Sequence, residues 1–177
     1  MKKSTYITTI AFAFVMLLST NVNAQKFPGL DKSPMDAASF PSNYKNSNKI
    51  AKIVYGRPQL KDSSLSDLAP NDKHWRLGAN EAAEITFYKD VNFGGQSVKA
   101  GTYTMSAIPG EKEWTLILSS DLNVWGHYFY NEANDVARVT AKASMGDESL
   151  EAFSIMFDEK GTMHMGWGKV RVSVPMK

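Results

Sequence analysis

The feature of this sequence that most restricts its fold is the alternation of apolar and polar residues over short segments. Residues 169–174 alternate without a break, and residues 137–143 place small apolar side chains on one face and polar ones on the other. A period of two is typical of a strand with one buried face. No sustained apolar stripe with helical spacing follows residue 24. The sequence therefore predicts an all-β fold.

Other segments show the same strand character, with more apolar residues on both faces. They are residues 49–55, 84–89, 101–108, 113–119, 124–130, 151–157 and 162–167. Turn residues separate them: Phe93-Gly94-Gly95-Gln96 predicts a hairpin, and residues 108–112 and 158–161 predict two more reversals. About nine or ten strands joined by short turns favour a single antiparallel β-sandwich of jelly-roll type.

The N-terminal segment has the pattern of a signal peptide. Lys2 and Lys3 precede an apolar run at residues 7–18, and Val22 and Ala24 provide the small residues of a cleavage site. The run is shorter than the roughly 20 residues of a membrane-spanning helix. We expect cleavage after Ala24, a periplasmic or extracellular location and no membrane insertion after cleavage. The expected organisation is a signal peptide at 1–24, an N-terminal arm at 25–36 and one domain at 37–177.

Charge and cysteine content exclude several classes of function. Of 20 basic residues, Lys2 and Lys3 lie in the leader, which leaves 18 basic residues against 18 acidic ones. A chain without excess positive charge lacks the electrostatic footprint of a nucleic-acid-binding protein. The absence of Cys rules out disulfides and zinc–thiolate sites. We expect no nucleic acid, no metal and no cofactor, while the oligomeric state is unknown from the sequence.

Residues 57–83 show no strand pattern, apart from one helical turn that Ser64 can cap. Such a long irregular stretch inside a domain is usually functional. It carries residue types that bind carboxylates and hydroxyls or stack on planar groups. The candidate binding residues here are Arg57, His74, Trp75, Arg76, Asn80 and Glu81.

Several motifs resemble one family of secreted bacterial proteins, the domain of unknown function 2911. They include Tyr55-Gly56-Arg57-Pro58, Trp75-Arg76-Leu77-Gly78-Ala79-Asn80-Glu81, Ala100-Gly101-Thr102-Tyr103 and Ile108-Pro109-Gly110. The similarity runs from about Ser33 to the C-terminus. Two departures are Lys61-Asp62-Ser63 in place of a Lys-Gly-Arg-like stretch, and His74 in place of a small apolar residue. The resemblance implies one exported domain and brings no known activity.

Aromatic residues suggest both a core and a ligand platform. Period two assigns Trp114, Phe153, Phe157 and Trp167 to the core. Trp125 lies in an aromatic-rich segment of the kind that saccharide-binding proteins use, and is a further candidate binding residue. Trp75, in the irregular segment, is the best candidate for an exposed ring.

Arg76 and Arg57 also have a structural interpretation, in which one of them pairs with Glu81 or Asp135 and holds the segment to the sheet. We expect such a partly buried pair for Arg76. The spacing of Asp121, Asn123, Gly126 and Glu132 partly matches a calcium loop, but Trp125 and the lack of flanking helices argue against it.

Three functions are compatible with these residues. The favoured one is a non-catalytic module that binds a small polar or saccharide ligand. The alternatives are a glycosidase-like hydrolase that uses Glu81 as acid or base, with Glu84 or Asp135 as second carboxylate, and a purely structural envelope protein.

Overall fold

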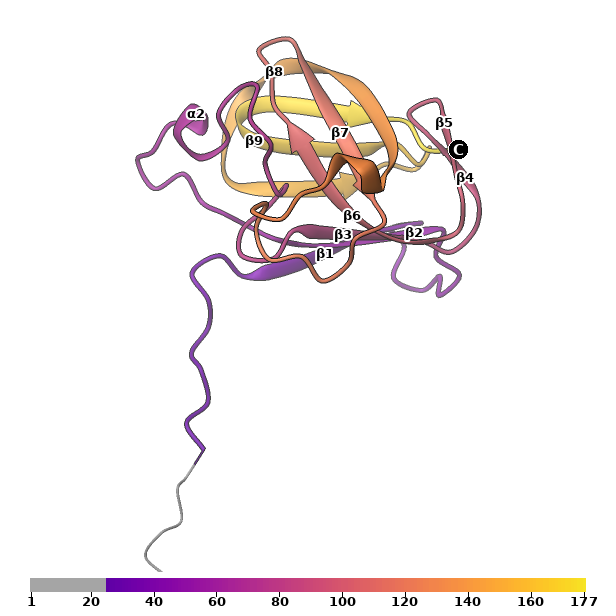
Figure 1. The fold of residues 1–177 in the computed structure, drawn as a ribbon, viewed down its shortest axis with the longest axis horizontal. Coiled ribbons are helices and arrows are strands. Elements are labelled where there is room, and N and C mark those ends of the chain that lie inside the picture. The colour runs from indigo at the N-terminus through magenta and orange to yellow at the C-terminus, as the bar shows by residue number, and fades with distance from the viewer. Residues whose placement is uncertain (1–24) are drawn as a thin grey trace, which may run out of the picture. The chain divides into compact units, whose positions relative to one another are not determined.

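The computed structural model describes residues 25–177. Residues 31–177 form one compact unit, and residues 25–30, at the end of the preceding unit, are exposed coil. The elements, of which Figure 1 labels all but η1, are β1 (Met35–Phe40), β2 (Ala51–Gly56), α2 (Leu65–Leu68), β3 (Ala83–Phe87), β4 (Val91–Phe93), β5 (Gln96–Val98), β6 (Gly101–Ile108), β7 (Glu113–Ser119), the 3-10 turn η1 (Glu132–Asn134), β8 (Asp135–Phe157) and β9 (Met163–Val174). The signal peptide that we predict lies outside the described residues.

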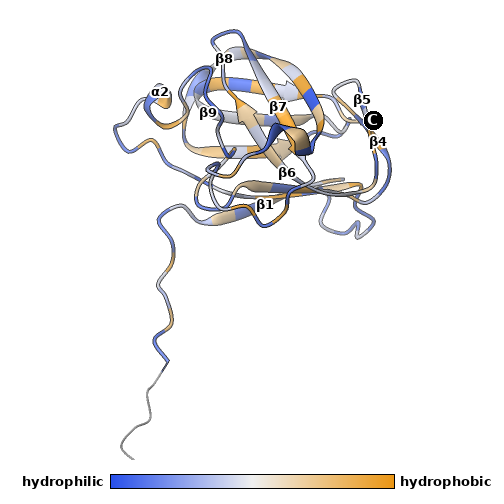
Figure 2. Ribbon diagram, in the orientation of Figure 1, coloured by the Kyte–Doolittle hydropathy of each residue, from blue (hydrophilic) through white to orange (hydrophobic). Residues whose placement is uncertain are grey.

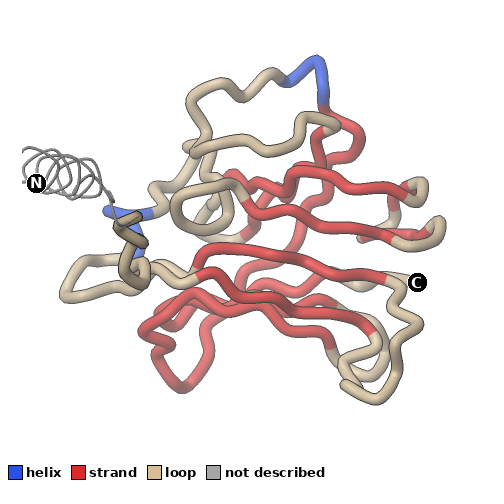
Figure 3. Tube along the Cα trace, turned by 90° about the horizontal axis from the view of Figure 1, so that it is seen from below, coloured by secondary structure: helices blue, strands red, loops and turns tan. Residues whose placement is uncertain are grey.

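Seven strands form one antiparallel sheet in the order β1-β2-β3-β6-β7-β8-β9. The long strand β8 pairs through residues 135–142 with β7 and through residues 143–157 with β9. Irregular pairing between Met145 and Ser154 lets β8 bend between these partners. The sheet therefore curls into two layers, as Figure 3 shows. The expected all-β antiparallel sandwich is confirmed. Its strand order is simpler than that of a jelly roll, because the strands of the large sheet lie side by side in the order in which they occur along the chain.

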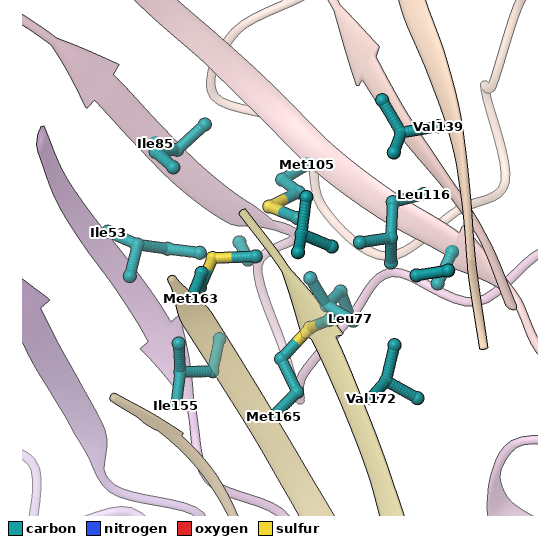
Figure 4. Close-up of a cluster of buried hydrophobic side chains, with 14 of the residues drawn as sticks. Ile53, Leu77, Ile85, Met105, Leu116, Val139, Ile155, Met163, Met165 and Val172 are labelled. Atoms are coloured by element: carbon teal, nitrogen blue, oxygen red, sulfur yellow. The ribbon is translucent and has the colours of Figure 1, made fainter. Parts of the chain in front are cut away.

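The hydrophobic core fills the space between the layers. Ile53, Ile85, Met105 and Leu116, from β2, β3, β6 and β7, meet side chains of β8 and β9 (Figure 4). Orange apolar bands alternate with blue polar ones along several strands in Figure 2. Trp114, Phe153, Phe157 and Trp167 all lie in this core, as the alternation predicts.

Two polar side chains at the end of β2 hold the layers together. The buried Tyr55 hydroxyl accepts a hydrogen bond from the Ile155 amide at 2.9 Å. Arg57 donates to the Phe153 carbonyl at 3.0 Å and to Ser154 Oγ at 2.7 Å. These bonds connect β2 to the second half of β8 without any strand pairing between them.

Most predicted strands lie where the alternation places them, and residues 101–108 and 113–119 match β6 and β7. The hairpin at Gly94 and Gly95 is present as the β4–β5 pair, and Ser64 caps α2 through a capping box with Asp67. One prediction is wrong: residues 124–130 belong to the loop between β7 and β8. We call residues 120–134 the β7–β8 loop.

Among the described residues, no helix combines the length and apolar character that a membrane crossing requires.

Candidate functional site

The irregular segment after α2 crosses β2 at very short range. An added Cβ at Gly56 would lie 2.3 Å from the Ala79 carbonyl oxygen, and one at Gly78 would lie 3.0 Å from the Gly56 carbonyl oxygen. Only glycines permit two backbones to approach this closely. Leu77, the residue before Gly78, is fully buried and has a φ of 53°, an uncommon conformation for a residue with a side chain. The family-like motifs around Gly56 and Gly78 therefore build one crossing.

A hollow of about 260 Å³ opens beside this crossing. Its walls combine two cationic side chains, Lys61 and Arg76, with the polar Gln59, Asn80 and Ser33. The rings of Trp75 and Trp167 also border it. No carboxylate is among the lining residues, so both charges of this hollow are positive.

The interactions of Arg76 differ from those that we predicted. Its Nε is buried and has no hydrogen-bond partner, and the ion pairs found within residues 25–177 do not include it. Asp135 pairs with Arg138 instead, at 2.7 Å, and Glu81 is exposed and outside these ion pairs. The expected bridge from Arg76 to a carboxylate is therefore wrong. The turn at Gly78 separates Arg76 and Glu81 into different hollows.

The second hollow, of about 270 Å³, shares Ser33, Ala79 and Asn80 with the first. It is lined by Glu81, Asp31 and Trp125, whose ring is 58% exposed. Isolated strand-like pairing of Glu81 with Trp125 holds the backbone of Trp125 beside the segment. We call the two hollows together the 76–81 groove. Its Arg76 end is cationic, and its Trp125 end is anionic and aromatic.

Arg57 is a structural residue. Beside its bonds to β8, it forms an ion pair with Asp36 of β1 at 3.1 Å. The partner is Asp36 and not the expected Glu81 or Asp135, but Arg57 does hold its segment to the sheet through an ion pair, which is the structural role that we considered. Arg57 does not line the groove.

The prediction of an exposed Trp75 is wrong. The ring is 5% exposed and stacks on Trp167, with centroids 5.5 Å apart. Its backbone exchanges two hydrogen bonds with Ala107 of β6. Trp125 is therefore the exposed tryptophan of the site.

His74 lies in a different place, under the β7–β8 loop. Its Nε2 shares a hydrogen bond with Ser106 Oγ at 2.8 Å, and its ring stacks on Tyr130 with centroids 3.9 Å apart. Burial, together with the nearby His127, lowers the pKa of His74 below its ordinary value. Burial and the hydrogen bond to Asp135 raise the pKa of Tyr130 to about 12. Both side chains are therefore uncharged at neutral pH.

Sequence reasoning missed the buried hydroxyl groups beside His74. Thr104, Ser106 and Ser119 are the buried polar residues of the described chain, and all line the same pocket. They alternate with core residues, so the sequence pattern places them on the solvent face of the sheet. Only the position of the β7–β8 loop, which covers that face, reveals that they are buried.

Within residues 25–177, no group of three His, Asp or Glu side chains is arranged to hold a metal ion. At the calcium-like spacing, Asp121 Oδ1 accepts a hydrogen bond from Nδ2 of the Asn134 side chain at 2.7 Å. This bond closes the β7–β8 loop at its base.

Fold and site together define an all-β protein in which one curled antiparallel sheet carries an open groove of divided charge. The family to which it belongs follows from comparison of sequences. Residues 33–176 match the model of the family described as protein of unknown function (DUF2911), and the chain belongs to that family. No curated protein and no solved structure matches it.

Proposed function

We propose that this chain is an exported protein that binds a small polar ligand with an anionic group in the 76–81 groove, without transforming it. The observation that carries the proposal is Arg76, whose buried Nε has no partner in a hollow free of carboxylates. A buried donor without a partner costs about 1–3 kcal/mol. A carboxylate or another oxyanion would remove this cost through a charge-assisted bond.

The other end of the groove favours a ligand with hydroxyl groups. Asp31 and Glu81 can accept hydrogen bonds, and the exposed face of Trp125 suits the apolar face of a sugar ring. Both hollows are smaller than the roughly 300–1000 Å³ of drug-sized pockets. A small acidic sugar fits these requirements.

Two observations support binding over the alternatives. The hydrolase would need Glu84 or Asp135 as a free second carboxylate, but Glu84 Oε1 accepts a hydrogen bond from the Asn123 backbone amide at 2.7 Å, and Asp135 is engaged by Arg138 and Tyr130. A purely structural role would leave the segment packed, whereas the 76–81 groove is open. Support for export is the leader pattern of residues 1–24.

The test uses D-glucuronate, with D-glucose as its neutral counterpart. Trp125 is the exposed tryptophan, so its fluorescence reports on the groove. We expect glucuronate to change this fluorescence saturably. Arg76→Gln should weaken glucuronate roughly 10–100-fold, because it removes a charged donor.

Lys142→Gln is the control, because it removes one exposed positive charge from β8, away from the groove. It should leave glucuronate binding unchanged. Equal loss in both variants would mean that net charge alone attracts the sugar. A glucuronate response insensitive to Arg76→Gln would refute the proposed site.

A further inference from the structure

The pocket around His74 is separate in chemistry from the 76–81 groove. It lies between the outer face of β6 and β7 and the β7–β8 loop. Its polar lining residues are His74, Thr104, Ser106, Ser119, Asp121, His127 and Tyr130. We call it the loop pocket.

The loop pocket contains hydrogen-bonding groups without partners. Thr104 is 6% exposed and its Oγ1 has no partner; the same is true of the buried His74 Nδ1. Two of the four buried side-chain atoms without partners in the described chain thus belong to residues that line this pocket. Asp135, whose Oδ1 is also without a partner, does not line the pocket; its other oxygen accepts a hydrogen bond from the Tyr130 hydroxyl at 2.7 Å.

The charges around the pocket are already engaged. Arg138 forms ion pairs with Asp135 and Glu132, and Asp121 Oδ1 accepts a hydrogen bond from the Asn134 side chain. No cationic side chain lines the pocket to receive an anion. The free Thr104 hydroxyl and the neutral His74 ring, depending on its tautomer, can serve a group that both donates and accepts. A hydroxyl group meets this requirement, whereas a carboxylate and an ammonium each offer only one role.

The size of the pocket and the residues at its mouth further restrict the class of ligand that can bind. The free space is about 20 Å³, enough for one oxygen-sized group. His127 and Phe129, both exposed, line its outer end, and Phe129 is 82% exposed. Beside them, the rings of His127 and Tyr128 stack with centroids 5.1 Å apart. A buried hydroxyl-sized hole therefore opens beside exposed aromatic rings.

From this arrangement we propose that the loop pocket is a second binding site, for a neutral saccharide whose hydroxymethyl group enters the pocket while its ring lies against Phe129. The hydroxymethyl oxygen reaches Thr104 and His74 after the β7–β8 loop shifts enough to admit its carbon. Water, which also donates and accepts, is the competitor that the sugar must displace.

Matched sugars and variants test the site. D-glucose carries the hydroxymethyl group, D-xylose is the same ring without it, and D-glucuronate has a carboxylate in its place. The methyl NMR signals of Val124, which lines the pocket, report on occupancy. For a monosaccharide we expect a millimolar dissociation constant for D-glucose. D-xylose should bind about tenfold more weakly, because the buried hydroxyls then stay unpaired.

Thr104→Val removes the hydroxyl and keeps the shape of the side chain. It should weaken D-glucose about tenfold and abolish the preference over D-xylose. Phe129→Ala should weaken both sugars alike. Thr115→Val is the matched control, because Thr115 lies on the same face of β7 as Ser119 but outside the pocket. It should leave the binding of both sugars unchanged.

Arg76→Gln should leave D-glucose binding unchanged, which separates this site from the groove. Equal affinity for D-glucose and D-xylose, absence of any saturable shift, or D-glucose binding that Thr104→Val leaves intact would each overturn the proposal. So would equal losses in the Thr104 and Thr115 variants, or loss of D-glucose binding in the Arg76 variant.

Discussion

Gly56→Ala tests the crossing on which the groove depends. The new methyl group would lie 2.3 Å from the Ala79 carbonyl oxygen, whereas ordinary contact begins near 3.4 Å. The segment must therefore retreat by about 1 Å, the difference between these two distances. Gly56 has no positive φ, so crowding is the sole cost in the folded state.

The magnitude follows from two opposing effects. Overpacking costs about 1–3 kcal/mol. Replacing Gly by Ala restricts the unfolded chain and returns about 0.4–1 kcal/mol. We expect a net loss of about 1–2 kcal/mol in the free energy of unfolding. A chain of this size should then melt lower by roughly 2–4 °C for each kcal/mol.

Urea unfolding followed by circular dichroism measures this loss as a lower midpoint with an unchanged slope. Glucuronate binding should fall in the same variant, because Ala79 and Asn80 line both hollows. Gly29→Ala is the control, since nothing lies within 4 Å of its added methyl group. A Gly56→Ala protein with wild-type stability and binding would refute the crossing.

Three further changes have defined outcomes. Tyr55→Phe leaves the Ile155 amide without its partner and should lower the free energy of unfolding by about 1–3 kcal/mol in urea melts; no loss would mean that water replaces the hydroxyl. Arg76→Met should raise thermal stability by about 1 kcal/mol while abolishing glucuronate binding, because it removes the unpartnered donor; a large destabilisation would reveal a structural partner. The pKa of His74 is lowered in the folded protein, so the unfolded chain takes up a proton first as pH falls below about 6.5, and the free energy of unfolding declines there. His74→Gln should reduce this decline between about pH 7.5 and pH 5, measured by urea melts of both proteins at each pH. An equal dependence of stability on pH in the two proteins would contradict the burial of His74.

The strands were predictable because alternation is a local property. Residues 101–108 and 113–119 carry enough β-branched and apolar residues, between clear turns, to define β6 and β7. The same local evidence fails at residues 124–130, where aromatic residues imitate a strand but serve a loop. It also fails to join residues 137–143 and 151–157 into β8, because the bend depends on pairing with β9.

The site was predictable only in part, because side-chain environments depend on distant segments. Arg76, Asn80, Glu81 and Trp125 line the two hollows of the 76–81 groove, and their role in binding stays a prediction. The burial of Trp75 depends on Trp167, which lies far away in the sequence, on β9. No local pattern distinguishes such a ring from an exposed one.

The bond between Tyr55 and Ile155 also has a consequence for the order of folding. Its partners are 100 residues apart, whereas most neighbours in the sheet are consecutive strands. Closing a long loop costs more entropy than closing a hairpin. We therefore expect the hairpins to form early and the two layers to meet last, so that the Tyr55 hydroxyl contributes to the rate of unfolding and hardly to the rate of refolding.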